Sequence, residues 1–446
     1  MIADTLLCAR WIVPVEPEAT VYEHHTIVVR EGLILAVLPT EEALTQYSSC
    51  VDIQHFDDHV LIPGLINAHT HSAMSLFRGI ADDLPLMEWL NQYIWPAEQQ
   101  WVNPEFTADG TRLAIAEMIR SGTTCFSDMY YYPDITGEVV IETGIRAMLG
   151  LIVIDFPTPW ASSSQEYFEK GAGVHDRFRY NPLIRTAFAP HAPYTVGDEA
   201  LSKIATLAEE LDVPIHMHLH ETQNEIEQHL EQHGDRPLQR LERLDLLSHR
   251  LNAVHMTQID RAEFSTLANY GVHVIHCPES NLKLASGFCP VHELLDQGVN
   301  VALGTDGAAS NNDLDMLGEM RTAALLGKGL TRDPQALGAR QVLRMATING
   351  ARALAMDDIT GSITPGKAAD IVAVDLDTPE TRPLYDPVSQ LVYSASRNQV
   401  TDVWVAGKQL LKQRELLTIN EARLMQKTAL WESRLTTDHE PPHKQG

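Results

Sequence analysis

"HVLIPGLINAHTH", residues 59–71, is a mostly apolar stretch that ends in two histidines, His69 and His71. Its apolar residues do not alternate with polar ones, and such a pattern is typical of a strand that is covered on both faces. Side chains two residues apart in a strand point to the same face. The two imidazoles therefore leave the strand end together and could hold one cation. Because the chain has 20 histidines, such a pair can also arise by chance, so it needs support from elsewhere.

Apolar segments of this kind recur along the chain, and several are followed by amphipathic helical segments such as 200–211 and 225–233. We expect eight strands in total, at 65–71, 123–129, 145–155, 184–193, 214–221, 252–256, 272–278 and 301–306. Strands that alternate with helices indicate a parallel sheet. Eight such units predict an α/β fold of the (β/α)8 TIM-like barrel type.

Short strand-like pieces with turns also occupy both ends of the chain. Neither end makes a full sheet alone, so we expect the two ends to pair into one small β domain. The predicted division is a β domain made of residues 1–60 and 366–430, a metal-dependent barrel at 61–365, and a polar tail at 431–446.

The composition excludes several classes of partner. With 33 Lys+Arg against 60 Asp+Glu, the net charge of −27 argues against nucleic acid and against an anionic membrane surface. The sequence has no apolar run of membrane-spanning length, and its first residues do not read as a signal peptide. The five cysteines lack CxxC spacing, which is typical of reduced thiols in the cytoplasm. We therefore expect a cytoplasmic protein.

Polar residues gather at the carboxyl ends of the expected strands, which is where barrels of this type carry their function. In chain order they are His69, His71, His191, His216, His218, His220, Glu221, His255, His276 and Asp306. Histidine and aspartate together suit zinc or a similar divalent ion. A catalytic ion would be held by His69 and His71, one histidine of residues 216–220, and Asp306. Period two places those three histidines on one face, so the pattern alone cannot choose among them.

Longer stretches around these residues carry a resemblance to a known family. They are "PGLINAHTHSAMSLFRGIADDLPLMEWLNQYIWPAE" (63–98), "PIHMHLHET" (214–222), "HCPESNLKLASGF" (276–288), "GTDGAASNNDLDML" (304–317) and "GSITPGKAADIVAVD" (361–375). They resemble the amidohydrolase superfamily and, within it, the 5-methylthioadenosine/S-adenosylhomocysteine deaminases. The resemblance covers nearly the whole chain.

The resemblance implies one divalent metal per subunit, with zinc the expected ion, bound by His69, His71, His218 and Asp306. It also implies that Glu98 binds the ribose hydroxyls of a nucleoside and that His191 contacts the purine ring. In some family members arginines hold the amino-acid carboxylate of the substrate. Arg146 and Arg185 are nearby in sequence, but neither lies in a motif that assigns it this role.

The resemblance implies hydrolytic deamination of adenine nucleosides, which converts 5′-methylthioadenosine, and S-adenosylhomocysteine, to the inosyl product and ammonia. Zinc would lower the pKa of its bound water toward about 7. Asp306 could accept that water's proton, and Glu221 could donate a proton to N1 of the ring and then relay one to the leaving amine. His255 is expected to hydrogen-bond the attacking hydroxide.

Two rival functions stay open. One is deamination of guanine or another free base, or hydrolysis of a triazine, by the same superfamily chemistry. The other is a non-catalytic scaffold, against which the complete ligand set and Glu221 argue. The long segment after His71 is expected to fold over the site, where Leu84, Leu86, Met87 and Trp89 would form an apolar pocket for the 5′ thioether. The expected partners are a small nucleoside and further copies of this chain in a homo-oligomer.

Overall fold

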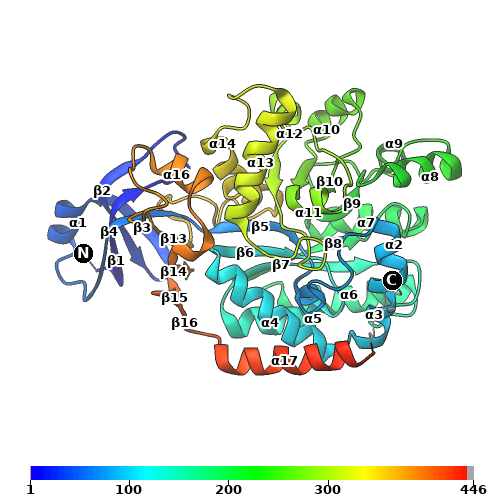
Figure 1. The fold of residues 1–446 in the computed structure, drawn as a ribbon, viewed down its shortest axis with the longest axis horizontal. Helices are drawn as coiled ribbons and strands as arrows, with labels where there is room; N and C mark the ends of the chain where they lie inside the picture. Colours follow the sequence, from blue (N-terminus) through cyan, green and yellow to red (C-terminus); the bar gives the residue numbers. More distant parts are fainter. Residues whose placement is uncertain (1, 439–446) are drawn as a thin grey trace, which may run out of the picture.

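Two eight-stranded sheets organise the computed structural model, which describes residues 2–438 (Figure 1). The larger unit is a barrel whose strands follow one another in chain order and pair in parallel. These strands are β5 (Leu65–Thr70), β6 (Thr123–Asp128), β7 (Arg146–Val153), β8 (Ile184–Pro190), β9 (Ile215–Leu219), β10 (Leu251–His255), β11 (His273–His276) and β12 (Val301–Leu303). The TIM-like barrel predicted from the sequence is confirmed.

The ring closes where the segment after β12 meets β5. The backbone N–H of Asp306 donates to the carbonyl of His69 at 3.0 Å, and the N–H of Thr305 donates to Oδ1 of Asn67 at 2.9 Å. Residue 304 must be glycine, because a Cβ at this position would lie 2.8 Å from the backbone nitrogen of His69. This close approach places Asp306 beside the histidines at the end of β5.

Amphipathic helices cover the outside of the barrel. In α7 (Asp198–Leu211), for example, Ala200, Leu201, Ile204 and Ala208 are buried, which is the spacing of one helix face. The other helices around the barrel are α4 (Pro104–Arg120), α5 (Pro133–Thr143), α6 (Ser164–Phe178), α8 (Gln223–His233), α9 (Pro237–Arg243), η3 (Arg261–Glu263), α10 (Phe264–Tyr270), α11 (Pro278–Lys283), α12 (Val291–Asp296), α13 (Met316–Thr331), α14 (Ala339–Met345) and α15 (Ile348–Ala353). Across residues 2–438, none of the helices combines the length and the apolar character needed to cross a bilayer.

The second sheet joins the two ends of the chain, in the order β16-β15-β14-β13-β4-β1-β2-β3 (Figure 1, left). Its strands are β1 (Thr5–Ile12), β2 (Tyr22–Arg30), β3 (Leu33–Pro39), β4 (Asp52–Pro63), β13 (Ile371–Asp375), β14 (Val400–Val405), β15 (Lys408–Lys412) and β16 (Glu415–Leu416). Short helices accompany it: α1 (Thr40–Gln46), α16 (Pro387–Tyr393) and η4 (Arg397–Gln399). The two ends meet where β4 and β13 pair antiparallel. A β unit built from both chain ends is thus confirmed, whereas its predicted boundaries, 1–60 and 366–430, stay predictions.

The last helix corrects one expectation. α17 (Glu421–Asp438) extends past residue 431, where we expected a polar tail. Trp431 and Leu435 are buried, and the indole nitrogen of Trp431 donates to Oδ2 of Asp109 at 3.0 Å. Two apolar side chains one helical turn apart therefore hold this segment against α4. Residues 439–446, the rest of the expected tail, lie outside the described residues.

A buried ion pair connects the barrel to the terminal sheet. Arg146, at the start of β7, pairs with Asp370 through Nε–Oδ2 at 2.9 Å and Nη2–Oδ1 at 3.1 Å. The two side chains are 3% and 0% exposed. The arginine also donates to the carbonyl of Pro182, and Asp370 accepts from the N–H of Ala406, so both charges have further polar partners.

We expect Asp370→Asn to lower the free energy of unfolding by about 3–5 kcal/mol, because it leaves the Arg146 charge buried without a counter-ion. The matched control is Glu138→Gln, which removes the exposed partner of Arg177 and should change the free energy by no more than about 1 kcal/mol. Urea denaturation of both variants measures the difference. Equal effects of the two substitutions would contradict the importance of burial here.

Candidate metal centre and active site

The carboxyl ends of β5, β9 and β12 bring four polar side chains to one rim of the barrel. His69 lies in β5 and His71 directly follows it, His218 lies in β9, and Asp306 is three residues beyond β12. His69, His218 and Asp306 are buried, and His71 is partly buried. The parallel strands make this convergence possible, since all their carboxyl ends lie on the same rim.

Three pairs of ligand atoms among these side chains are close enough to share a metal ion. Nε2 of His69 lies 3.2 Å from Nε2 of His218 and 3.3 Å from Oδ1 of Asp306. Nε2 of His71 lies 3.2 Å from the same oxygen. Tetrahedral ligands at zinc-ligand distances of 2.0–2.2 Å lie about 3.3–3.5 Å apart. Two groups of possible metal ligands, His69-His71-Asp306 and His69-His218-His255, share His69. The measured distances between ligand atoms in this region are therefore compatible with a bound divalent ion.

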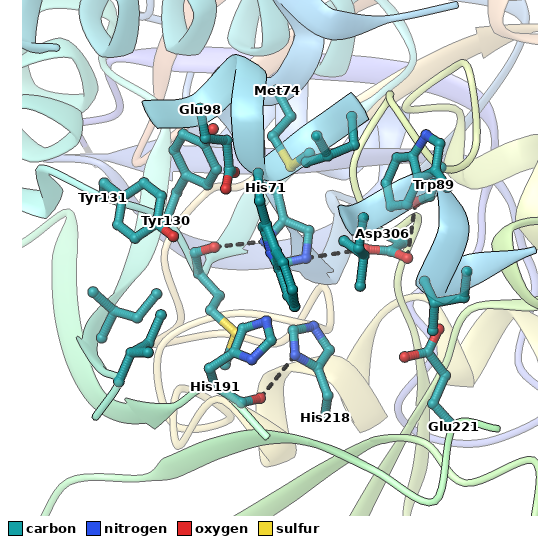
Figure 2. Close-up of a pocket in the computed structure, with 18 of the residues that line it drawn as sticks. His71, Met74, Trp89, Glu98, Tyr130, Tyr131, His191, His218, Glu221 and Asp306 are labelled. Atoms are coloured by element: carbon teal, nitrogen blue, oxygen red, sulfur yellow. Dashed lines mark hydrogen bonds and ion pairs between the residues drawn. The ribbon is translucent and has the colours of Figure 1, made fainter. Parts of the chain in front are cut away.

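The second ring nitrogen of two histidines fixes their orientation. Nδ1 of His71 lies 2.5 Å from the carbonyl of Met129, and Nδ1 of His218 lies 2.8 Å from the carbonyl of His191 (Figure 2). A carbonyl can only accept, so Nδ1 carries the hydrogen and Nε2 presents its lone pair. Burial also lowers the pKa of His218 well below its usual value, which keeps this imidazole neutral.

The structure separates the three histidines of β9 that the pattern could not rank. His218 faces the other ligand atoms, whereas Nε2 of His216, one step deeper in the barrel, lies 2.8 Å from Nδ1 of His69. His220 has a positive φ of 52°, and its Nε2 accepts from the N–H of Leu238. The turn after the strand therefore directs His220 toward α9, away from the site.

Asp306 is oriented by two hydroxyl groups that the sequence analysis did not single out. Its Oδ2 accepts from Ser280 at 2.7 Å and from Ser310 at 2.9 Å, while Oδ1 faces His69 and His71 and accepts from the N–H of Gly307. Burial by itself would raise the pKa of Asp306, but the imidazoles of His69 and His71 beside its Oδ1 outweigh burial and hold the pKa well below its usual range. Asp306 is therefore ionised. Ser280 and Ser310 lie in segments 276–288 and 304–317, each shortly after the end of a barrel strand. This position could have identified them as site residues.

Glu221 and His255 lie beside this cluster. Burial raises the pKa of Glu221 well above its usual range, and the nearby carboxylates of Asp306 and Glu225 add to the rise, which favours the protonated form of Glu221. Nε2 of His255 lies 3.9 Å from Oε2 of Glu221. The amide of Asn281 lies 2.9 Å from Nδ1 of His255. An amide nitrogen donates, so Nδ1 of His255 accepts this hydrogen bond. Nε2 of His255 then carries the hydrogen and faces the cavity.

Glu225 holds the backbone next to Glu221 in place, and the sequence patterns did not identify it. Its carboxylate accepts from the N–H of His220 at 2.9 Å and from the N–H of Glu221 at 2.8 Å. A carboxylate in the first turn of α8 thus grips the turn between β9 and that helix, close to the helix N-terminus. An acid four residues after Glu221 was the signal that could have identified it.

The segment after His71 forms much of the cavity wall, as expected. It folds as η1 (Ser72–Phe77), α2 (Leu86–Trp89), the π-helical turn η2 (Leu90–Ile94) and α3 (Trp95–Trp101). The residues that it contributes to the cavity are Met74, Leu86, Trp89, Leu90, Ile94, Trp95 and Glu98. Leu84 and Met87, which we had also expected there, are not among the residues that line this cavity.

Glu98 points into the same cavity as the metal cluster (Figure 2). Its carboxylate is buried beside the rings of Tyr130 and Tyr131, which follow β6 after Met129, and burial raises the pKa of Glu98 to about 7. The aromatic run after a barrel strand was the signal for the two tyrosines, which the sequence analysis missed. A carboxylate in this place can accept hydrogen bonds from hydroxyl groups of a bound molecule.

His191 completes the polar part of the wall. It follows β8, lies edge-to-face on His218 with ring centroids 5.0 Å apart, and its Nδ1 is 3.1 Å from the hydroxyl of Thr195. Burial lowers its pKa to about 3, so this ring is neutral. The structure therefore brings every predicted site residue to one cavity wall, except His69, which sits behind it.

Neither arginine considered in the sequence reaches this cavity. Arg146 is paired with Asp370 at the opposite end of β7. Arg185 is the second residue of β8 and is exposed, at the opposite end of that strand from His191. Both arginines lie at the amino-terminal ends of their strands, whereas the site lies at the carboxyl-terminal ends.

The comparison with known proteins agrees with this geometry. Residues 60–410 match the model of the amidohydrolase family. The chain is a member of the amidohydrolase family. A protein of Saccharophagus degradans named 5-methylthioadenosine/S-adenosylhomocysteine deaminase is 49% identical over 97% of each chain. This amidohydrolase is also similar to a crystal structure of an adenosine deaminase from Xanthomonas campestris with bound zinc, at 53% identity and a TM-score of 0.95, covering 98% and 99% of the two chains.

A more distant solved structure shows the extent of the shared fold. The atrazine chlorohydrolase TrzN from Arthrobacter aurescens, complexed with zinc, aligns with a TM-score of 0.89 over 96% of this chain and 99% of its own, at 24% identity. At this identity the likeness concerns the fold alone. The choice of substrate must therefore be argued from the cavity.

Proposed function

We propose that this amidohydrolase deaminates adenine nucleosides, with 5′-methylthioadenosine as a substrate. The observation that carries the proposal is Glu98, a buried carboxylate that shares one cavity with the His-Asp cluster and with Glu221. A carboxylate can accept from both hydroxyls of a ribose, a charge-assisted pairing. A free base such as guanine has no diol to offer it. The name of the Saccharophagus degradans relative and that of the Xanthomonas campestris structure support the same class of reaction.

The proposed metal site holds one divalent ion per chain, with zinc preferred. His69, His71, His218 and Asp306 would hold it, and the donor set together with the zinc in the Xanthomonas campestris structure supports this choice. When bound, zinc supplies a Lewis acid that lowers the pKa of water and so provides a nucleophile at neutral pH.

The residues of the chain supply the proton transfers of the proposed reaction. Water adds to C6 of the adenine ring, and ammonia leaves. Asp306, which is ionised, accepts a proton from the attacking water. Glu221, which is protonated, donates to ring N1 and then relays a proton to the departing amino group. We assign to His255 a hydrogen bond to the attacking oxygen and to His191 a contact with the purine ring.

Glu98→Ala is the direct test of this substrate. Hydrogen bonds to a charged group contribute about 1.5–3 kcal/mol each, so losing two should lower kcat/KM for 5′-methylthioadenosine by about 10² or more. Values for 2′,3′-dideoxyadenosine and guanine should change far less, since neither offers a diol. The matched control is Glu88→Ala, an exposed glutamate of α2 in the same segment.

Two results would instead support deamination of guanine or another free base. One is guanine as the best substrate of the unaltered enzyme, and the other is unchanged turnover of 5′-methylthioadenosine in Glu98→Ala. A homo-oligomeric assembly and a cytoplasmic location are further parts of the proposal. The five cysteines, which are all free and buried, support the location.

A further inference from the structure

The wall of the active-site cavity carries no ammonium or guanidinium group. Among the described residues that line it, none is lysine or arginine, whereas Glu98, Glu221 and Asp306 are acidic. Most of the remaining wall is apolar or aromatic. An anionic 5′ group of a bound molecule would therefore meet hydrocarbon and aromatic side chains, with no lysine or arginine to pair with it.

Lys283 is the basic residue closest in sequence to the residues that line the cavity, and it forms an ion pair with Asp82. Lys283 precedes the lining residue Leu284, and its Nζ lies 2.7 Å from Oδ1 of Asp82. It also contacts the side chain of Asn312, which in turn donates to Asp82. This network ties Lys283 to the segment before α2.

The wall near Glu98 is built from bulky apolar side chains. Trp95 lies one turn before Glu98 in α3, so both side chains share one face of that helix. Its ring contacts Phe156 edge-to-face, with centroids 6.2 Å apart. Ile152 and Ile154, in and after β7, line the same cavity. A 5′ substituent on a ribose held at Glu98 would meet this surface.

We propose that this 5′ subsite, formed by Trp95, Ile152, Ile154 and Phe156, selects adenine nucleosides whose 5′ group is uncharged and apolar. S-adenosylhomocysteine is then the poorer substrate, because its carboxylate loses water and gains no lysine or arginine partner in this subsite. The inference rests on the proposed function. It adds that the charge of the 5′ group decides which nucleosides are the better substrates. The subsite residues act on specificity and take no part in the chemistry.

The test uses three nucleosides with the same four-carbon 5′ thioether chain. They are 5′-butylthioadenosine, 5′-(3-carboxypropyl)thioadenosine, which adds only the carboxylate, and S-adenosylhomocysteine, which adds the carboxylate and the ammonium. A carboxylate left without a partner should lower kcat/KM by about 30-fold or more relative to the butyl compound. The carboxypropyl compound should be the poorest. Equal values within about threefold for all three would overturn the inference.

A pair of variants tests the role of the wall. Phe156→Arg places a cation at a position that is 39% exposed, at the edge of the subsite. It should raise the ratio of kcat/KM for S-adenosylhomocysteine to that for 5′-butylthioadenosine by about tenfold. Phe156→Gln is the neutral control and should leave the ratio unchanged. An equal rise in both variants, or none in Phe156→Arg, would contradict the assignment.

Failure of this inference can be told apart from failure of the proposed function. If adenosine and 5′-methylthioadenosine are not deaminated at all, the proposed function is wrong. If both are deaminated and the charged and uncharged thioethers react equally well, only the selectivity of the subsite is wrong.

Discussion

His71→Ala is expected to lose both the bound metal and the deaminase activity. The substitution removes one of the four proposed ligands, whose Nε2 lies 3.2 Å from Oδ1 of Asp306, and it leaves that oxygen facing only His69. A protein metal site loses most of its affinity when a ligand is removed, since no other side chain can take the vacant position. Metal analysis of the purified variant, together with an ammonia-release assay, measures both losses.

His233→Ala is the matched control, because His233 is exposed in the last turn of α8 and does not line the cavity. It should keep one ion per chain and full activity. Circular dichroism of both variants separates loss of metal from loss of fold. Full metal content in His71→Ala, or two ions per chain in the unaltered protein, would contradict the single-ion site.

Glu221→Gln is expected to keep the metal and to lose turnover by roughly 10²–10⁴, the range for removing a positioned proton donor. Glutamine preserves the size of the side chain but cannot donate and recover a proton as a carboxylic acid does. Glu221 is not among the atoms that converge on the metal position, so the ion should remain. The measurement is kcat on 5′-methylthioadenosine with metal content determined on the same sample.

The control for this substitution is Glu227→Gln, an exposed glutamate on α8 that accepts a hydrogen bond from Gln223. It should change neither metal content nor kcat. If Glu221→Gln loses metal along with activity, Glu221 has been assigned the wrong role. An unchanged kcat would remove it from the proton-transfer steps altogether.

Local pattern was enough to predict the barrel and the place of its site. A buried parallel strand must be apolar along its length, and its end is where polar side chains can reach solvent or a ligand. For this reason His69 and His71, at the end of such a run, and Asp306, at the end of the last one, could be grouped before any contact was known. The resemblance to a family then selected His218 and Glu98.

Contacts between distant residues were beyond the reach of pattern. Arg146 reads in sequence like a candidate for binding an anionic substrate, yet it pairs with Asp370, 224 residues later in the chain. Trp431 reads as part of a polar tail, yet it is buried against Asp109. In both cases the partner is brought close only by the packing of the barrel against other elements.

The sequence by itself determined which rim of the barrel carries the chemistry, because strand direction and period two follow from local periodicity. Only the tertiary structure decided which histidine of β9 joins the cluster, since His216 and His220 share the period of His218 but differ in depth and in backbone conformation. It also decided the character of the 5′ subsite. The residues of that subsite come from α3 and from the end of β7, and no local pattern records that they face one another across a cavity.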